Sequence, residues 1–141
     1  MRPVAALGLL ASATILSGCA SLAPAACLPT RLAGQAEGRR VELFFGRDIG
    51  DRLGVSDADF QGFVDAELTP RFPDGLTVLD AAGQWRGADG VIGREPSKLV
   101  ILVLPGRTGG EDRLDAVRQA YRQRFSQEAV LMTVQPTCMS F

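Results

Sequence analysis

The sequence contains no histidine and a single lysine, Lys98, among its 141 residues. Without an imidazole, the chain lacks the side chain that most often serves as general base, proton shuttle or metal ligand near neutral pH. Nucleophiles of the Ser-His and Cys-His type are therefore excluded, and the phosphate-binding pattern GxGxxG is also absent. Carboxylate, arginine and phenol chemistry remain. On this basis we name no catalytic residue and expect neither a metal nor a cofactor.

An excess of charge of one sign is also missing. The chain has 15 basic and 16 acidic residues, with a formal net charge of −1. Because no block of like charge occurs, the sequence argues against nucleic acid as a partner. The length from Cys19 onward fits one folded domain.

The N-terminus has the layout of a secretory signal peptide, with a charged start, an apolar run over residues 4–16 and the small residues Ser17 and Gly18. The apolar run is shorter than the ~20 residues of a membrane span. The tetrapeptide Leu16-Ser17-Gly18-Cys19 resembles the bacterial lipobox, in which the cysteine thiol is alkylated by a diacylglycerol. We therefore expect a signal peptide over residues 1–18 and acylated Cys19 anchored in membrane lipid. The expected location is the outer membrane, facing the periplasm.

An ordinary cleavage site of the A-x-A type at Ala23-Pro24-Ala25 is the alternative, and it would leave a soluble periplasmic protein. In the lipobox interpretation, residues 19–38 form an Ala/Pro/Gly-rich tether between membrane and domain.

Once Cys19 is assigned to lipid, Cys27 and Cys138 remain as an even pair in an oxidising compartment, where disulfides form and persist. Two unrelated thiols, one buried as a small apolar side chain, are the alternative. Two thiols without histidine do not make a four-ligand zinc set. We expect a Cys27–Cys138 disulfide.

Periodicity predicts strands over residues 39–46, 75–80, 97–105 and 129–134, and helices after Ser56 and after Thr108. The glycine-rich residues 81–96 indicate a bent hairpin extension or a loop. The order β-α-β-β-α-β is that of the ferredoxin-like arrangement. We expect a ferredoxin-like α+β domain over residues 39–141, with a four-stranded antiparallel sheet in the order 4-1-3-2 and two helices on one face. The expected core contains Leu43, Phe45, Phe60, Val64, Leu68, Val117, Tyr121 and Phe125, with Phe63 toward its edge.

The stretches VELFFGR, TPRFPDGLTVLDAAGQWR, REPSKLV and AYRQRFSQEAVL resemble a family of small bacterial envelope proteins. That family is known as a domain of unknown function (group 3574). The resemblance covers about residues 37–141. The chain departs from the family pattern at Ala129 and in the DIGDRLG loop. The resemblance implies a secreted or lipidated bacterial domain, and it implies no reaction.

Four polar or aromatic residues are candidates for contacting a ligand or partner: Arg47, Arg71, Trp85 and Glu95. Arginine binds carboxylates and phosphates in a bidentate manner, and tryptophan offers a stacking face. Each also has a structural interpretation. Arg71 would fix a turn, Trp85 would cover a loop, Glu95 would pair with an arginine, and Arg47 would be a strand-end cation.

The sheet face away from the helices is expected to carry apolar side chains, including Phe44. Such patches usually mark contact surfaces, so a second copy in a homodimer, the N-terminal segment or a small apolar ligand would cover it. We expect a non-catalytic, membrane-tethered binding or interaction module. The alternative is a small-ligand-binding protein or enzyme of the dimeric α+β-barrel type, which a deep pocket holding Arg47, Trp85 and Glu95 would favour.

Overall fold

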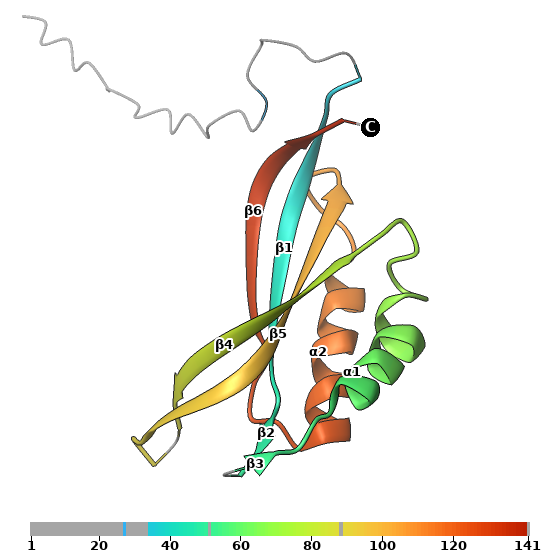
Figure 1. Ribbon diagram of the computed structural model, residues 1–141. Coiled ribbons are helices and arrows are strands. Elements are labelled where there is room, and N and C mark those ends of the chain that lie inside the picture. The colour runs from blue at the N-terminus through green and yellow to red at the C-terminus, as the bar shows by residue number, and fades with distance from the viewer. Residues whose placement is uncertain (1–26, 28–33, 51, 88, 141) are drawn as a thin grey trace, which may run out of the picture.

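Two helical regions cover one face of a four-stranded antiparallel sheet, as Figure 1 shows. The computed structural model describes residues 27, 34–50, 52–87 and 89–140. The main elements follow the order β-α-β-β-α-β, and the predicted α+β class with two helices on such a sheet is confirmed. In chain order the elements are β1 (Ala36–Gly46), β2 (Asp48–Ile49), β3 (Arg52–Leu53), α1 (Asp57–Phe63), η1 (Val64–Leu68), β4 (Thr77–Arg86), β5 (Ile92–Pro105), α2 (Glu111–Phe125) and β6 (Leu131–Met139).

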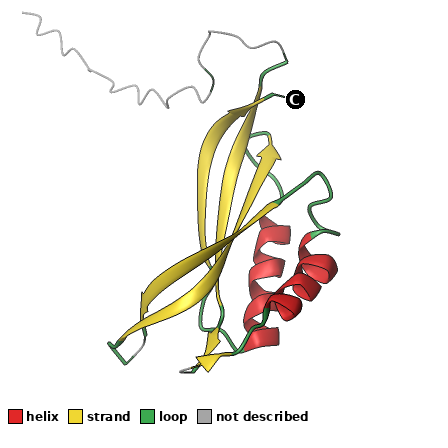
Figure 2. Cartoon of the chain, viewed as in Figure 1, coloured by secondary structure: helices red, strands yellow, loops and turns green. Residues whose placement is uncertain are grey.

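The order across the sheet is β4-β5-β1-β6, and every neighbouring pair is antiparallel. The strands predicted as 1, 2, 3 and 4 correspond to β1, β4, β5 and β6, so the order read from the β6 edge is β6-β1-β5-β4. Strands β2 and β3 form a separate two-stranded ribbon, which the sequence pattern does not predict. Figure 2 shows both helices on the same side of the strands, which leaves the opposite face without a helix. We call this opposite side the open face.

The core lies between the sheet and the helices, and all eight residues expected in it are buried. Phe45 on β1 points toward the helices and meets Tyr121 of α2 edge-on, with ring centroids 4.7 Å apart. The expectation for Phe63 is wrong, because this side chain is completely buried rather than at the edge. Its ring packs 5.0 Å from that of Tyr121 and 6.0 Å from that of Phe125. Edge-to-face contacts of this kind add to the area that the rings bury.

The first helical region begins at a capping box formed by Ser56 and Asp59. The Ser56 hydroxyl accepts the Asp59 N–H at 3.1 Å, and the Asp59 carboxylate accepts the Ser56 N–H at 3.1 Å. The region changes from α-helix to π-helix at Val64, where the wider turn brings the Thr69 N–H to the Val64 carbonyl at 2.8 Å. It ends before Pro70, which has no backbone N–H to donate to the preceding turn, although Thr69 itself keeps helical dihedrals with φ −57° and ψ −44°.

The β4–β5 hairpin is longer than the strands predicted at 75–80 and 97–105. Pairing continues from Thr77↔Ile101 to Arg86↔Ile92, so most of the glycine-rich segment is strand rather than loop. The Gly87 N–H donates to the Val91 carbonyl at 2.9 Å to close the turn, in which Gly90 has a left-handed φ of 82°. Cross-strand pairing therefore overrides the weak strand propensity of these glycines.

Residue Cys27 is joined to Cys138 by a disulfide, with Cα atoms 5.3 Å apart, as expected. Cys138 lies opposite Glu37 in the β1–β6 pairing, so the bridge sits at the end of the sheet where β1 begins. β1 begins at Ala36, three residues before the predicted domain boundary. The predicted signal peptide, Cys19 and most of the predicted tether lie outside the described residues.

Candidate functional site

The open face carries one apolar row across all four strands. Phe44 of β1 lies opposite Leu131 of β6 on one side and Leu99 of β5 on the other, and Leu99 lies opposite Leu79 of β4. Leu131 and Leu79 are 51% and 45% exposed. The row confirms the apolar open face that the strand patterns predict.

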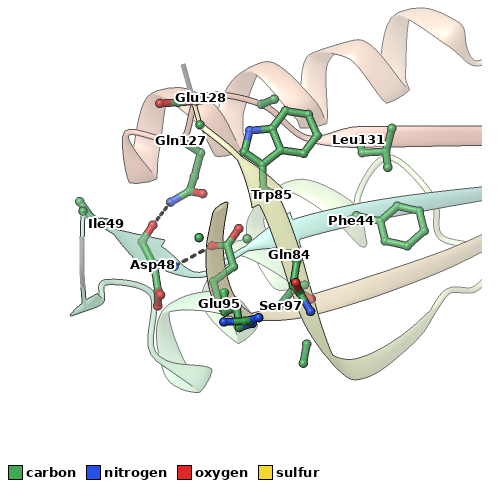
Figure 3. A pocket seen from close by; sticks show the side chains of 18 of the residues that line it. Phe44, Asp48, Ile49, Gln84, Trp85, Glu95, Ser97, Gln127, Glu128 and Leu131 are labelled. Atoms are coloured by element: carbon green, nitrogen blue, oxygen red, sulfur yellow. Dashed lines mark hydrogen bonds between the residues drawn. The ribbon is translucent and has the colours of Figure 1, made fainter. Parts of the chain in front are cut away.

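Beside this row, the open face is hollowed into a groove of about 940 Å³. The β4–β5 hairpin forms one wall, and the end of β1, β2 and the segment between α2 and β6 form the other. Figure 3 shows most of the side chains that line it. Its lining includes Phe44, Gly46, Asp48, Trp85, Asp89, Arg94, Glu95, Gln127, Glu128 and Leu131.

The Glu95 carboxylate lies directly over Gly46. A Cβ atom at Gly46 would approach Glu95 Oε1 to 2.5 Å and Oε2 to 2.6 Å, so a larger residue there would displace the carboxylate from this position. The Asp48 N–H donates to Oε2 at 3.2 Å, and Gln127 Nε2 in turn donates to the Asp48 carbonyl at 2.7 Å. Both bonds are drawn in Figure 3. The Asp48 N–H thus positions the carboxylate over Gly46, and the Gln127 side chain in turn holds the Asp48 peptide.

Below Gly46, on the helix side of the sheet, the Tyr121 hydroxyl donates to the Gly46 carbonyl at 2.8 Å. Burial raises the pKa of Tyr121 above its ordinary value; the nearby Arg47 opposes this effect and Glu95 adds to it. The phenol therefore stays protonated and remains a donor to the groove floor.

Trp85 is on the same face as Glu95, one strand away. It lies opposite Gly93, and Glu95 lies opposite Gly83, so the two residues are diagonal neighbours, a spacing that large side chains span. The indole is 51% exposed and projects into the groove from β4 (Figure 3). A ligand lying between the two would contact a ring and a carboxylate together.

The two other candidate residues do not line the groove. Arg47 is buried, donates from Nε to the Val55 carbonyl at 2.8 Å and pairs with Asp57 at 3.2 Å, so it connects the end of β1 to the start of α1. Arg71 pairs with Glu67 at 2.7 Å, just after η1. The structure thus brings Trp85 and Glu95 together and keeps Arg47 and Arg71 apart from them.

Three residues of the site were not predicted: Gly46, Asp48 and Gln127. A glycine inside a strand pattern often marks a close approach of another group, so Gly46 carried a usable signal. Asp48 contributes its backbone and Gln127 a side chain from a segment 79 positions away, for which the sequence offers no local signal. Within the described part of the chain, no group of acidic or cysteine side chains has a metal-site arrangement.

Residues 40–141 match the profile of the family described as "Protein of unknown function (DUF3574)". The chain belongs to this family. The match confirms the resemblance noted from the sequence. No curated protein matches the chain.

Solved structures with similar folds include a phage SAM lyase in complex with S-methyl-5'-thioadenosine. Its TM-score is 0.59 at 19% identity, over 82% of this chain and 97% of the lyase. The same lyase in the apo state has a TM-score of 0.54 at 19% identity and the same coverage. CutA from Synechococcus elongatus PCC7942 has a TM-score of 0.50 at 15% identity, over 77% of this chain and 87% of CutA. At these identities the likeness concerns the fold alone, and these neighbours have folds of the ferredoxin-like type.

Among the described residues, no helix has the length and apolar character needed to cross a membrane.

Proposed function

We propose that this protein is an envelope-anchored module that binds a small ligand in the groove of its open face. The observation that carries the proposal is the placement of Glu95, whose carboxylate is seated on Gly46 and held by the Asp48 N–H beside the exposed ring of Trp85. A concave site with apolar lining and a few fixed polar groups is the usual form of a ligand site. The phage lyase, which shares the fold and has S-methyl-5'-thioadenosine bound, supports a small molecule as the occupant.

The anchor in this proposal is acylated Cys19 in the outer membrane. The Cys27–Cys138 bridge fixes Cys27 to the domain, so only the eight residues from Cys19 to Cys27 separate the lipid anchor from the domain. Eight extended residues span at most about 29 Å. The groove lies at the other end of β1 from the bridge, about 30 Å away along a strand of this length. The anchor therefore holds the disulfide end of the sheet near the membrane and leaves the groove accessible.

The protein contains a single tryptophan, and it lies in the groove, so its fluorescence reports occupancy directly. Full-length protein in mild detergent is titrated with S-methyl-5'-thioadenosine and with a panel of small amines and aromatic compounds. We expect a saturable change for at least one compound, weakened in Glu95→Gln. Glu67→Gln is the matched control, since Glu67 pairs with Arg71 away from the groove. Absence of any saturable change, or equal weakening in both variants, would contradict the proposal.

An enzyme of the dimeric α+β-barrel type is a second candidate. The apolar row of Leu131, Phe44, Leu99 and Leu79 favours it, because a second copy on the open face would bury the row and enclose the groove. Sedimentation of the detergent-solubilised protein gives the oligomeric state, and mass spectrometry of the bound compound after incubation detects any reaction. A monomer that returns its ligand unchanged would exclude this candidate.

A further inference from the structure

The charges around the groove are mainly negative. Four carboxylate side chains occur among its described lining residues, and Arg94 is the only cation there. The carboxylates are those of Asp48, Asp89, Glu95 and Glu128. The potential inside such a concave, partly apolar site favours a cation over an anion.

Among the described residues, Glu95 forms no ion pair. In the described segments 34–50, 52–87 and 89–140, the lysine and arginine side chains form their ion pairs with other acids. The lone lysine, Lys98, pairs with Asp57 at 2.6 Å and Asp80 at 2.5 Å on the opposite side of the sheet. A half-buried carboxylate with a single backbone donor keeps strong acceptor capacity for a donor that arrives with a ligand.

An aromatic face completes the arrangement. Trp85 is the diagonal neighbour of Glu95 on the same face, and its indole is half exposed. Tryptophan gives the strongest cation–π interaction among the aromatic side chains, and organic cations are recognised where such rings line a site. A carboxylate and an indole at this spacing would contact the charge of one ligand from two directions.

We propose that the groove selects an organic cation, such as an ammonium or sulfonium compound, through Glu95 and Trp85. This inference rests on the proposed small-ligand function and specifies the chemical class. Neutral ligands of the same shape would lose the attraction of the carboxylates, and negative ligands would meet four carboxylates against a single cation, Arg94, among the described lining residues.

Matched pairs of probes test the inference. Choline is compared with 3,3-dimethylbutan-1-ol, its neutral isostere, and S-adenosylmethionine with S-adenosylhomocysteine, which lacks the sulfonium charge. Binding to the full-length protein is followed by tryptophan fluorescence and, for Trp85 variants, by calorimetry. We expect the cation of at least one pair to bind roughly tenfold tighter than its neutral partner, with a preference that weakens as salt increases.

Glu95→Gln should remove most of this preference while the protein stays folded, since the amide keeps the shape of the carboxylate. Trp85→Leu should weaken binding of the cation more than that of the neutral partner, and Glu67→Gln should change neither. Equal binding within both pairs, or a preference that persists in Glu95→Gln, overturns the inference while leaving small-ligand binding intact. If no member of either pair binds, the organic-cation inference fails; if the wider panel also fails, the proposed function fails with it.

Discussion

The Tyr121 hydroxyl donates a hydrogen bond to the carbonyl oxygen of Gly46 at 2.8 Å, across 75 positions of sequence. Gly46 is also the residue on which the Glu95 carboxylate is seated from the other side of the sheet. The hydrophobic core and the groove thus share one peptide unit, with a phenol below it and a carboxylate above it. A change in the core at Tyr121 should therefore alter ligand binding in the groove.

Tyr121→Phe should lower the free energy of unfolding by about 1–3 kcal/mol, because it leaves the Gly46 carbonyl without this donor while keeping the ring contacts with Phe45 and Phe63. Denaturant titration of the variant and the wild type measures the difference. The same variant should also weaken ligand binding in the groove without abolishing it. A free energy of unfolding in Tyr121→Phe equal to that of the wild type would show that the hydrogen bond makes no net contribution to stability.

Stability should decrease at alkaline pH through the same residue. Burial raises the pKa of Tyr121 in the folded protein, whereas in the unfolded chain the phenol ionises near its ordinary value of about 10. Above that pH the unfolded state releases a proton that the folded state keeps, so the free energy of unfolding falls as pH rises toward the folded-state pKa. Below about pH 10 the contribution is fully present.

The chain has one tyrosine, so tyrosinate absorbance during a pH titration follows Tyr121 alone. We expect its ionisation to lie above that of free tyrosine and to coincide with unfolding at high pH. Tyr121→Phe serves as the control, because its stability should lose this part of the pH dependence. A phenol that ionises at the ordinary value in the folded protein would contradict the prediction.

Reduction of the Cys27–Cys138 disulfide should destabilise the domain. The bridge joins residues 111 positions apart, and the chain-entropy model gives up to ~4.7 kcal/mol for a loop of about 100 residues, with ~2–4 kcal/mol typical. Cys138→Ser and reduced wild type should show the same loss in a denaturant titration. Non-reducing mass mapping should recover a peptide containing Cys27 joined to one containing Cys138. Separate peptides with alkylated thiols, from protein isolated without reductant, would show that the bridge does not form.

Cys19→Ser tests the anchor. If Leu16-Ser17-Gly18-Cys19 is a lipobox, the variant should lose incorporation of labelled fatty acid and should leave the membrane fraction or accumulate as precursor. Stable acylation holds a protein far more firmly than a single weak contact, since each buried methylene contributes ~0.8 kcal/mol. Cleavage near Ala25 with release of soluble wild-type protein would favour the A-x-A alternative.

Several features of the fold follow from local sequence. Val41, Leu43 and Phe45 alternate along one strand, and Phe60, Val64 and Leu68 recur at helical spacing, so their burial was predictable. The same period of two places Arg47 on the helix side with Phe45, which is why it does not reach the groove. Alternation therefore contained evidence against including Arg47 in the site.

The sequence by itself determined the element order, the apolar faces and, through the parity and position of its cysteines, the disulfide. Tertiary structure alone decided the site. The extent of the β4–β5 hairpin, and hence the diagonal placement of Trp85 and Glu95, depends on cross-strand register rather than on the propensity of a glycine-rich segment. The contact of the Glu95 carboxylate with Gly46 joins residues 49 positions apart. The hydrogen bond from Gln127 to Asp48 joins residues 79 positions apart. Local patterns specify which face a side chain occupies, whereas such contacts exist only after the strands have paired and the helices have packed.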